Sequence, residues 1–214
     1  MSSDERKLGL DDAYAVETPD DNRALYKDWA STYEADFIEP RGYIYHEEVV
    51  RLFVDVVGTT GPVLDVGCGT GIVGEALASQ GVEIIDGIDI SPEMLAEASG
   101  KGCYRDLSEV DVTQPLDIAD GAYGGVTSVG TFTHGHLGPE PLHELVRVVA
   151  PGGVLAIGIN AEHYEEMGFE ATLTALEDSG AIEPRRLERV RIYSNADDEH
   201  ADDLALVALL TRAH

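Results

Sequence analysis

The part of the sequence best suited to hold a reactive group is a glycine-rich loop. Residues 63–71 read Val-Leu-Asp-Val-Gly-Cys-Gly-Thr-Gly, an apolar strand pattern followed by alternating glycines. Glycines allow a sharp turn and let a ligand approach the backbone, and the helix that should follow offers unpaired N–H groups at its N-terminus. The loop therefore predicts a site for a nucleotide-like cofactor. Because residues 69–74 also fit the pattern GxGxxG, the loop alone leaves a dinucleotide open.

Aspartates near the ends of the first three predicted strands narrow the choice of cofactor. Asp65 stands at the mouth of the loop, where a carboxylate would repel a pyrophosphate and attract a cationic amino acid moiety. This favours S-adenosylmethionine, which has an ammonium and a sulfonium and no phosphate, over NAD. Asp89 is placed to bind the ribose hydroxyls of either cofactor. Asp111, beside the apolar Val112, offers an acceptor for the adenine amine.

The residues after the fourth predicted strand are candidates for handling a proton. They include His134 and His136, and a histidine suits this task because its pKa lies near neutrality. If S-adenosylmethionine is the cofactor, its methyl group passes to an acceptor molecule. We expect one of the two histidines to face that acceptor and to assist removal of its proton. The alternative is that both hydrogen-bond to backbone groups in a glycine-rich loop. No third ligand is identifiable beside them, so no metal site is predicted.

These residues need a framework in which strands and helices alternate. Apolar runs predict strands over residues 63–66, 82–89, 106–111, 125–129 and 154–159, and helices over 70–80, 92–99, 139–149 and 163–179. Two further predicted strands, 187–193 and 204–211, are separated only by a polar loop and form a hairpin. The expected fold is α/β, a mostly parallel sheet with helices on both faces and one antiparallel strand near the C-terminus.

The N-terminal part of the chain precedes this alternation. Residues 1–17 are polar and aperiodic, so we expect a flexible tail. Thr18 and the proline after it predict the start of a helix that ends at Pro40, and a second helix is predicted over 43–57. Tyr33, on the apolar face of the first helix, is a candidate for an aromatic lid over the cofactor. The sequence contains no linker that would divide it, so we expect residues 18–214 to form one domain in which residues 18–57 are a helical lid.

Several segments resemble a known family, the class I S-adenosylmethionine-dependent methyltransferases. The similar segments are residues 63–71, 87–95, 111–112 and 145–153, and residues 26–33 and 128–136 further resemble the small Williams-Beuren-region methyltransferase-like subfamily. The resemblance implies a Rossmann-like, doubly wound, seven-stranded sheet in a three-layer sandwich with a C-terminal antiparallel hairpin. It also implies glycines at the methionine end of the cofactor and Ile90 against the adenine. The full set expected to bind the cofactor is Tyr33, Asp65, Gly67, Cys68, Gly69, Gly71, Asp89, Ile90, Met94, Asp111, Val112 and Val129.

The amino-acid composition limits which partners the protein is expected to bind and the environment in which it is expected to work. The 214 residues include 14 Lys plus Arg against 41 Asp plus Glu, a formal net charge of −27, which disfavours nucleic acid and anionic membrane surfaces. Such a surface favours an extreme halophile over an unusually acidic mesophilic protein. Cys68 and Cys103 are expected to be free thiols, and no window reaches the roughly 20 apolar residues of a membrane span, so we expect a cytoplasmic protein.

The function predicted from these observations is methyl transfer from S-adenosylmethionine to a small-molecule acceptor that the sequence does not identify. Two alternatives remain open. One is an NAD-dependent oxidoreductase on a related sheet, against which Asp65 and the C-terminal hairpin argue. The other is a regulator that binds S-adenosylmethionine without catalysis.

Overall fold

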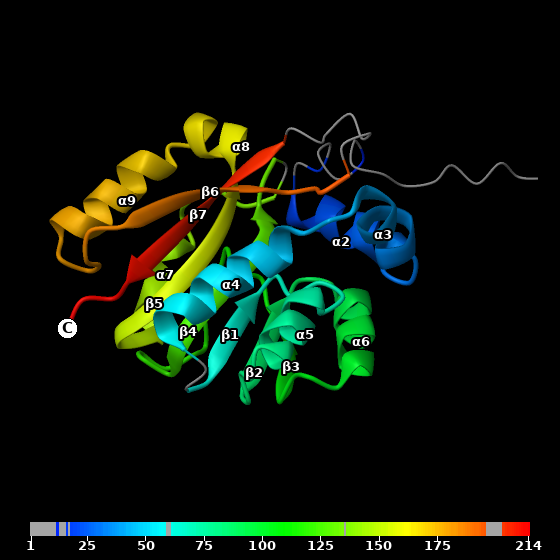
Figure 1. Ribbon diagram of the computed structural model, residues 1–214, viewed down its shortest axis with the longest axis horizontal. Helices are drawn as coiled ribbons and strands as arrows, with labels where there is room; N and C mark the ends of the chain where they lie inside the picture. Colours follow the sequence, from blue (N-terminus) through cyan, green and yellow to red (C-terminus); the bar gives the residue numbers. More distant parts are fainter. Residues whose placement is uncertain (1–11, 13–15, 17, 59–60, 135, 196–202) are drawn as a thin grey trace, which may run out of the picture.

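One seven-stranded sheet forms the centre of the molecule (Figure 1). The computed structural model describes residues 12, 16, 18–58, 61–134, 136–195 and 203–214. Across the sheet the strand order is β3-β2-β1-β4-β5-β7-β6. Strands β1 to β5 pair in parallel, and β7 runs antiparallel to both β5 and β6. The strands are β1 (Val63–Val66), β2 (Ile85–Asp89), β3 (Asp106–Glu109), β4 (Tyr123–Phe132), β5 (Val149–Asn160), β6 (Arg186–Arg191) and β7 (Leu204–Thr211).

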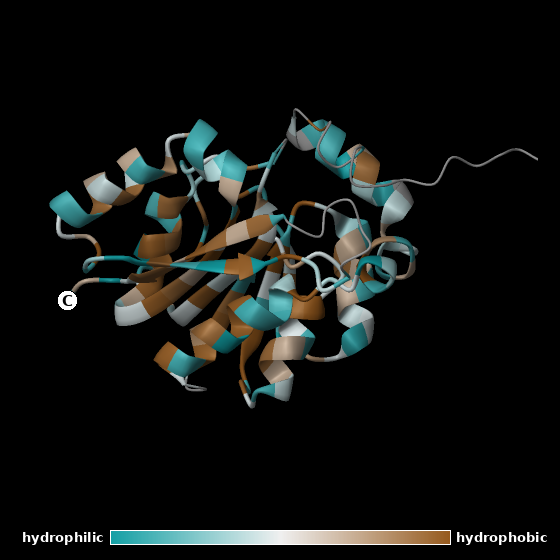
Figure 2. Cartoon of the chain, turned by 45° about the horizontal axis from the view of Figure 1, so that its top comes forward, coloured by the Kyte–Doolittle hydropathy of each residue, from teal (hydrophilic) through white to brown (hydrophobic). Residues whose placement is uncertain are grey.

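Helices cover both faces of the sheet, which makes three layers. One apolar cluster joins α4 and α5 to one face, and a second cluster joins α7 and α9 to the other. Side chains alternate between the two faces along β1, because Val63 packs in the first cluster and Leu64 in the second. Figure 2 shows the hydrophobic colouring gathered on the strands. The helices are α2 (Pro19–Trp29), the π-helix η1 (Glu34–Ile38), α3 (Glu39–Arg41), α4 (Tyr45–Val57), α5 (Ile72–Ser79), α6 (Pro92–Lys101), α7 (Leu142–Val148), α8 (Ala161–Glu166) and α9 (Phe169–Asp178).

The predicted α/β fold, with its mostly parallel sheet and C-terminal antiparallel hairpin, is confirmed. Several predicted element bounds were wrong, and for two of them the structure shows the reason. The strand predicted from Val82 begins at Ile85, because the Val82 N–H bonds to the Leu77 carbonyl and extends the end of α5. The single helix predicted over 163–179 is two helices, because Gly168 between them takes a left-handed conformation with φ of +75°.

The N-terminal segment is more broken than predicted. Thr18 caps α2 and shares a reciprocal capping box with Asp21, as its position before Pro19 suggests. The helix ends at Trp29, however, and Pro40 lies inside α3 instead of ending the segment, because a proline in the first turn of a helix forfeits no internal hydrogen bond. The segment ends at Gly42, which is left-handed. The predicted tail over 1–17 lies outside the described residues except for positions 12 and 16.

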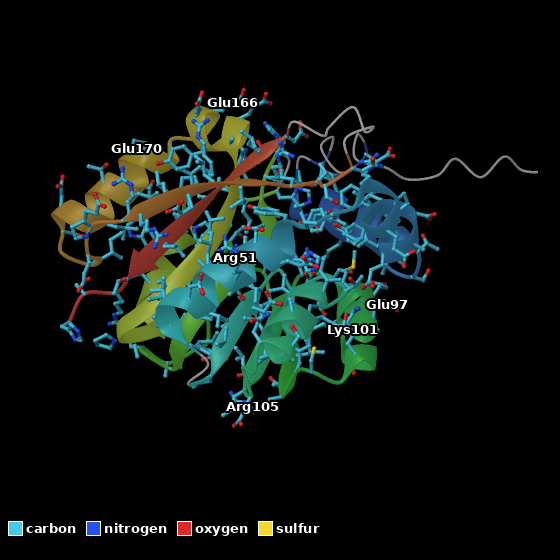
Figure 3. All side chains as sticks on the ribbon, in the orientation of Figure 1. Arg51, Glu97, Lys101, Arg105, Glu166 and Glu170 are labelled. Atoms are coloured by element: carbon cyan, nitrogen blue, oxygen red, sulfur yellow. The ribbon has the colours of Figure 1, made fainter. Side chains whose placement is uncertain are left out.

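Contacts far apart in the sequence hold this segment over the sheet. The ammonium of Lys101, on α6, lies 3.0 Å from a carboxylate oxygen of Glu34 in η1 and also pairs with Glu75 on α5 (Lys101 is labelled in Figure 3). At the other side, Tyr43 forms a β-bridge with Tyr193, just after β6. The N-terminal segment is therefore fixed both to the helices beside β2 and to the C-terminal hairpin.

Candidate active site

A cavity opens at the carboxyl ends of β1, β2, β3 and β4, where ligands of open α/β sheets bind. The N-terminal segment forms part of its wall, through residues of α2 and others up to Tyr43. Most of the residues predicted to bind a cofactor line this first cavity, while Asp65 and Gly71 do not. The predicted residues in its lining are Tyr33, Gly67, Cys68, Gly69, Asp89, Ile90, Met94, Asp111, Val112 and Val129.

Asp89 is held in place by two backbone N–H groups, one from the glycine loop and one just after β2. Its Oδ2 accepts the N–H of Gly69 at 2.8 Å, and its Oδ1 accepts the N–H of Ser91 at 2.9 Å. Burial raises the pKa of the Asp89 carboxyl, and the two N–H donors oppose that rise. A carboxylate oxygen can accept about two hydrogen bonds, so each oxygen keeps capacity for a ligand hydroxyl.

The glycine loop presents open backbone to the cavity. Gly69 has a φ of +52°, and a Cβ built on it would meet no atom within 4 Å. A Cβ on Gly67 would instead collide with Thr131 from the end of β4. Next to these glycines, Thr70 is 3% exposed, and its hydroxyl has no hydrogen-bond partner among the described residues. The loop thus offers space for a ligand together with a buried polar atom that a ligand can satisfy.

Asp65 lies beneath the loop and not in the cavity wall. It is fully buried; Tyr104 donates a hydrogen bond of 2.7 Å to its Oδ2, and Thr127 donates one of 3.5 Å to its Oδ1. The same Tyr104 hydroxyl accepts the N–H of Gly74 at 3.1 Å, one turn into α5. Burial raises the pKa of Asp65 to about 7. Asp65 therefore supports the loop and the start of α5 from below.

Gly71 has a packing role at the same place. A Cβ on Gly71 would lie 3.1 to 3.2 Å from atoms of Lys101, Tyr104 and Ala98, so the glycine lets α6 and the residues after it approach α5 closely. Reasoning from the sequence missed Tyr104. It precedes a short, polar edge strand, and no local pattern marks it as the partner of a carboxylate 39 positions earlier.

The third predicted acid sits in a tight turn after β3. Oδ1 of Asp111 accepts both the N–H of Thr113 at 3.0 Å and its hydroxyl at 2.6 Å. This side-chain turn fixes the carboxylate at the rim of the first cavity, with Val110 and Val112 beside it in the lining. The arrangement is a polar edge on an apolar wall, as the sequence predicts.

A second cavity adjoins the first on the side of β4 and β5. Its wall is aromatic, with side chains from α2, η1 and the residues around β6, and its described lining contains no Asp, Glu, Lys or Arg. The two cavities share five residues, Tyr26, Tyr33, Tyr43, Gly130 and His136. The remaining residues of the second lining are Trp29, Phe37, Tyr45, Phe132, Thr133, Gly158, Asn160, Ile192 and Tyr193.

His136 lies at the junction of the two cavities. Its Nδ1 is 2.9 Å from the carbonyl oxygen of His134, and its Nε2 is 3.1 Å from the hydroxyl of Tyr26. Burial lowers the pKa of His136, so the ring is neutral near pH 7. A carbonyl only accepts, so we assign the proton to Nδ1, which leaves Nε2 as the acceptor for the Tyr26 hydroxyl.

His134 points to a different neighbourhood and is absent from the lining of both cavities. Its ring packs edge-on against His163, with centroids 5.3 Å apart, and its Nε2 is 3.6 Å from a carboxylate oxygen of Glu166 on α8. The two predicted histidines are therefore separated by the loop, and only His136 reaches the junction. In the part of the chain that the structure describes, no three His, Cys, Asp or Glu side chains gather as metal ligands.

Similar proteins identify the family. A methyltransferase domain model matches residues 64–157, which run from β1 to β5. Methyltransferase-like protein 27 of Homo sapiens is 34% identical over 171 residues, which cover 74% of this chain and 67% of that protein. A Saccharomyces cerevisiae 18S rRNA (guanine(1575)-N(7))-methyltransferase is 34% identical over 70 residues, but these cover only 33% of this chain and 26% of that one.

Solved structures share the fold at low sequence identity. The methyltransferase in a complex with the Trm112 methyltransferase activator of Haloferax volcanii matches with a TM-score of 0.66 at 19% identity, covering 88% of this chain and 98% of that one. The N-methyltransferase NodS of Bradyrhizobium japonicum, in complex with S-adenosyl-L-homocysteine, matches with a TM-score of 0.59 at 20% identity, covering 79% and 86%. With its glycine loop, sheet order and likeness to the human relative, the chain belongs to the class I S-adenosylmethionine-dependent methyltransferases.

Proposed function

We propose that the protein transfers the methyl group of S-adenosylmethionine, bound in the first cavity, to a small molecule bound in the second. The observation that carries this proposal is the junction of the two cavities, where five residues line both. A cofactor on one side and an acceptor on the other would then meet beside Tyr26 and His136. Direct transfer requires such contact, because the two reactants must be held within bonding reach of each other.

The residues of the first cavity fit S-adenosylmethionine. The open backbone at Gly69 and the unsatisfied Thr70 hydroxyl suit the polar methionine end, with Gly67 and Cys68 beside them. Asp89 has hydrogen-bonding capacity left for ribose hydroxyls. Asp111 and Val112 would hold the adenine edge. Ile90, Met94, Val129 and Tyr33 supply apolar contacts around these groups.

Two predicted residues act on the cofactor site through others in this proposal. Asp65 is a positioning residue, because it reaches the loop through Tyr104 and the N–H of Gly74. Gly71 acts by allowing the close packing of α6 against α5. Asp65 thus supports the methionine end of the cofactor site without lining the cavity itself.

S-adenosylmethionine, when bound, supplies an electrophilic methyl group whose carbon–sulfur bond breaks with its electron pair moving to sulfur. The protein's own task is to hold the acceptor, exclude water and accept a proton where the acceptor carries one. His136 is suited to accept it, because its unprotonated Nε2 lies in the wall that both cavities share. His134 is a positioning residue, since its carbonyl fixes the proton on Nδ1 of His136.

A small-molecule acceptor agrees with the charge and the shape of the site. The net charge of −27 opposes association with a phosphate backbone, although some relatives are named as rRNA methyltransferases. The second cavity is also lined mainly by aromatic side chains and contains no Lys or Arg in its described lining. Membership of the family argues against an NAD-dependent oxidoreductase. We further propose that the protein belongs to the Williams-Beuren-region methyltransferase-like subfamily, comes from a halophile and acts in the cytoplasm. As a separate finding, none of the described helices has the length and apolar character of a membrane span.

Calorimetry in high salt tests the cofactor assignment. S-adenosylhomocysteine should bind and NAD should not, and Asp89→Ala should weaken the binding by about 1.5 to 3 kcal/mol, the scale for hydrogen bonds to a charged group. Asp178→Ala, at an exposed position of α9, is the matched control and should bind as the parent does. Binding of NAD, or equal affinity in the Asp89 variant, contradicts the proposal. Incubation with methyl-labelled S-adenosylmethionine and an extract of the source cells then separates an enzyme, which labels a product, from a regulator, which does not.

A further inference from the structure

The walls of the second cavity restrict the chemistry of its occupant. Eight Phe, Tyr and Trp side chains line it: Tyr26, Trp29, Tyr33, Phe37, Tyr43, Tyr45, Phe132 and Tyr193. Aromatic faces and edges favour a flat, apolar or aromatic ligand. In a chain with 41 acids, the absence of any charged residue from the described lining leaves neither an ammonium nor a carboxylate with an ion-pair partner.

A charged occupant is disfavoured by further contacts around the cavity. An anion would enter a protein of net charge −27 with no Lys or Arg in the described lining to receive it. A cation could in principle stack on aromatic faces, but the guanidinium of Arg41 already lies over the Phe37 ring, 5.1 Å from its centroid. The aromatic rings also pack against one another, since Trp29 contacts the rings of Tyr33 and Phe37 in edge-to-face geometry. An uncharged ligand avoids both costs.

One buried hydrogen-bond donor among the lining residues, the indole N–H of Trp29, has no acceptor in the part of the chain that the structure describes. Trp29 is 1% exposed, and its indole Nε1 has no hydrogen-bond partner among the described residues. Buried indole N–H groups usually have an acceptor, and an unsatisfied one costs about 1 to 3 kcal/mol. Trp29 lines the second cavity, so we assign to this N–H an ether, carbonyl or hydroxyl oxygen of the ligand that binds there. The occupant is therefore aromatic and oxygen-bearing.

The junction of the cavities shows which hydroxyl His136 is arranged to receive. Nε2 of His136 already accepts a hydrogen bond from a phenol, the hydroxyl of Tyr26, at 3.1 Å. A phenol has an ordinary pKa near 10, whereas an aliphatic alcohol is far less acidic, so a neutral imidazole can assist only the former efficiently. The Tyr26 hydroxyl can in turn accept from a second hydroxyl while it donates to His136.

We infer that the methyl acceptor is an uncharged aromatic compound with a phenolic hydroxyl, bound in the second cavity. This inference rests on the proposed function and names its substrate class. The ring lies among the aromatic side chains, and its hydroxyl meets Tyr26. The acceptor oxygen forms a bond to the methyl carbon, the carbon–sulfur bond breaks with its electron pair going to sulfur, and the proton passes through the Tyr26 hydroxyl to Nε2 of His136 and then to water.

The test measures binding and not turnover. Calorimetry with the full chain first establishes S-adenosylhomocysteine binding, and the saturated protein is then titrated with 4-methoxyphenol. Three probes keep the methoxyphenyl ring and replace the hydroxyl: 4-methoxytoluene carries a methyl group, 4-methoxybenzylamine a cationic aminomethyl group and 4-methoxybenzoate an anionic carboxylate. We expect 4-methoxyphenol to bind about tenfold or more tightly than each of the others, since losing a hydrogen bond or burying an unpaired charge costs at least that factor.

Two variants place the binding in the second cavity. Thr133→Phe adds a ring to a residue that lines only this cavity and should weaken 4-methoxyphenol about tenfold or more, while S-adenosylhomocysteine affinity stays within about twofold. Thr174→Phe, at an exposed position of α9, is the control and should change neither affinity. The unchanged cofactor affinity of Thr133→Phe also shows that the variant folds.

The outcomes distinguish an error in the acceptor class from an error in the proposed function. Failure of S-adenosylhomocysteine to bind overturns the proposed function. If S-adenosylhomocysteine binds but the amine or the benzoate binds better than the phenol, or all four probes bind equally, the acceptor class is wrong and the cofactor site stands. An unchanged affinity of Thr133→Phe for 4-methoxyphenol would likewise overturn the acceptor class and leave the cofactor site in place.

Discussion

The hydroxyl of Tyr104 donates a hydrogen bond of 2.7 Å to the carboxylate of Asp65, which is completely buried under the glycine loop. The same hydroxyl accepts the N–H of Gly74 at 3.1 Å. One tyrosine therefore joins the end of β1 to the first turns of α5. The two elements that position the loop are connected through a residue that follows α6.

Replacing Tyr104 by phenylalanine should destabilise the fold. The change removes a donor from a buried carboxyl group and an acceptor from a buried N–H, so we expect a loss of about 1 to 3 kcal/mol in the free energy of unfolding. Urea unfolding measures it. Tyr123→Phe is the control: Tyr123 donates to Asp86 at 2.9 Å, but Asp86 keeps hydrogen bonds from Arg105, so the loss should be smaller. Equal losses in the two variants would contradict the role given to Tyr104.

The pKa of Asp65 predicts a dependence of stability on pH. Burial raises this pKa from 3.8 to about 7 in the folded state, so the proton favours folding. The contribution is fully present below pH 3.8 and is lost as the pH rises through 7. Asp65→Asn has no such proton, and its free energy of unfolding relative to the parent should rise by about 2 to 3 kcal/mol between pH 5 and pH 8.

Urea unfolding of both proteins at the two pH values, at constant salt, measures this difference. Subtracting the parent cancels the titration of the other acids, which the two proteins share. Asp178→Asn, at an exposed position, should show no comparable change relative to the parent. A flat difference for Asp65→Asn would mean that Asp65 is ionised in the folded state at pH 5.

Two glycines that both have positive φ can be compared to distinguish an effect on cofactor binding from an effect on stability. Gly69 and Gly102 have φ values of +52° and +67°, and a Cβ on either would meet nothing within 4 Å. Alanine at each position should cost about 1 to 2 kcal/mol of stability, because L-residues rarely adopt this conformation. Only Gly69→Ala should also weaken S-adenosylhomocysteine binding in calorimetry, since Gly69 lines the first cavity and Gly102 ends α6. A similar loss of affinity in both would place the cofactor elsewhere.

The sequence predicted the parallel framework well because each strand carries its own signal. All four residues of β1 are buried because both faces of the strand are covered, and three of them are apolar; the glycines after it are needed for positive φ at Gly67 and Gly69. The helix boundaries were less secure. A local signal was present at Gly168, because glycine readily takes the left-handed conformation that ends a helix, whereas no local pattern marks the end of α2 at Trp29.

The residues around the junction could be only partly predicted. His134 and His136 are two positions apart in one loop, and the sequence offers no basis for choosing between them. The choice is made by the loop's own hydrogen bonds, such as that from the His136 N–H to the Thr133 carbonyl at 3.0 Å. Tyr26 is part of an aromatic stripe that also suits simple helix packing. Its meeting with His136, 110 positions later, is a tertiary contact.

The two histidines should differ in turnover once an acceptor is known. His136→Ala removes the Nε2 acceptor at the junction and should lower turnover about 10²-fold, the usual scale for loss of a general base, with cofactor affinity retained. His134→Ala keeps the backbone carbonyl that orients His136, so its effect should be within a few-fold. The pH dependence of the rate should shift in the first variant alone. Equal losses in both would assign His134 a part beyond orientation.

Stability should rise steeply with chloride concentration. With 41 acids against 14 cations, many carboxylates lie within one Debye length of another at 0.1 M salt, where that length is about 10 Å. At 1 M it falls to about 3 Å and the repulsion is screened. Thermal melts from 0.1 to 3 M potassium chloride measure the effect; sulfate is avoided because it strengthens hydrophobic burial. A melting temperature that stays flat or falls would refute the halophile proposal.

The bridge between Tyr43 and Tyr193 also bears on how the protein is made. Beside it, the Ser194 hydroxyl donates to the Gly42 carbonyl across 152 positions of sequence. A nascent chain leaves the ribosome from its N-terminus, so Tyr43 emerges long before Tyr193 has been synthesised. A chain arrested before β6 would contain the glycine loop and its supporting strands but would lack Ile192 and Tyr193 from the wall of the second cavity. The second cavity is complete only when nearly the whole chain has been translated.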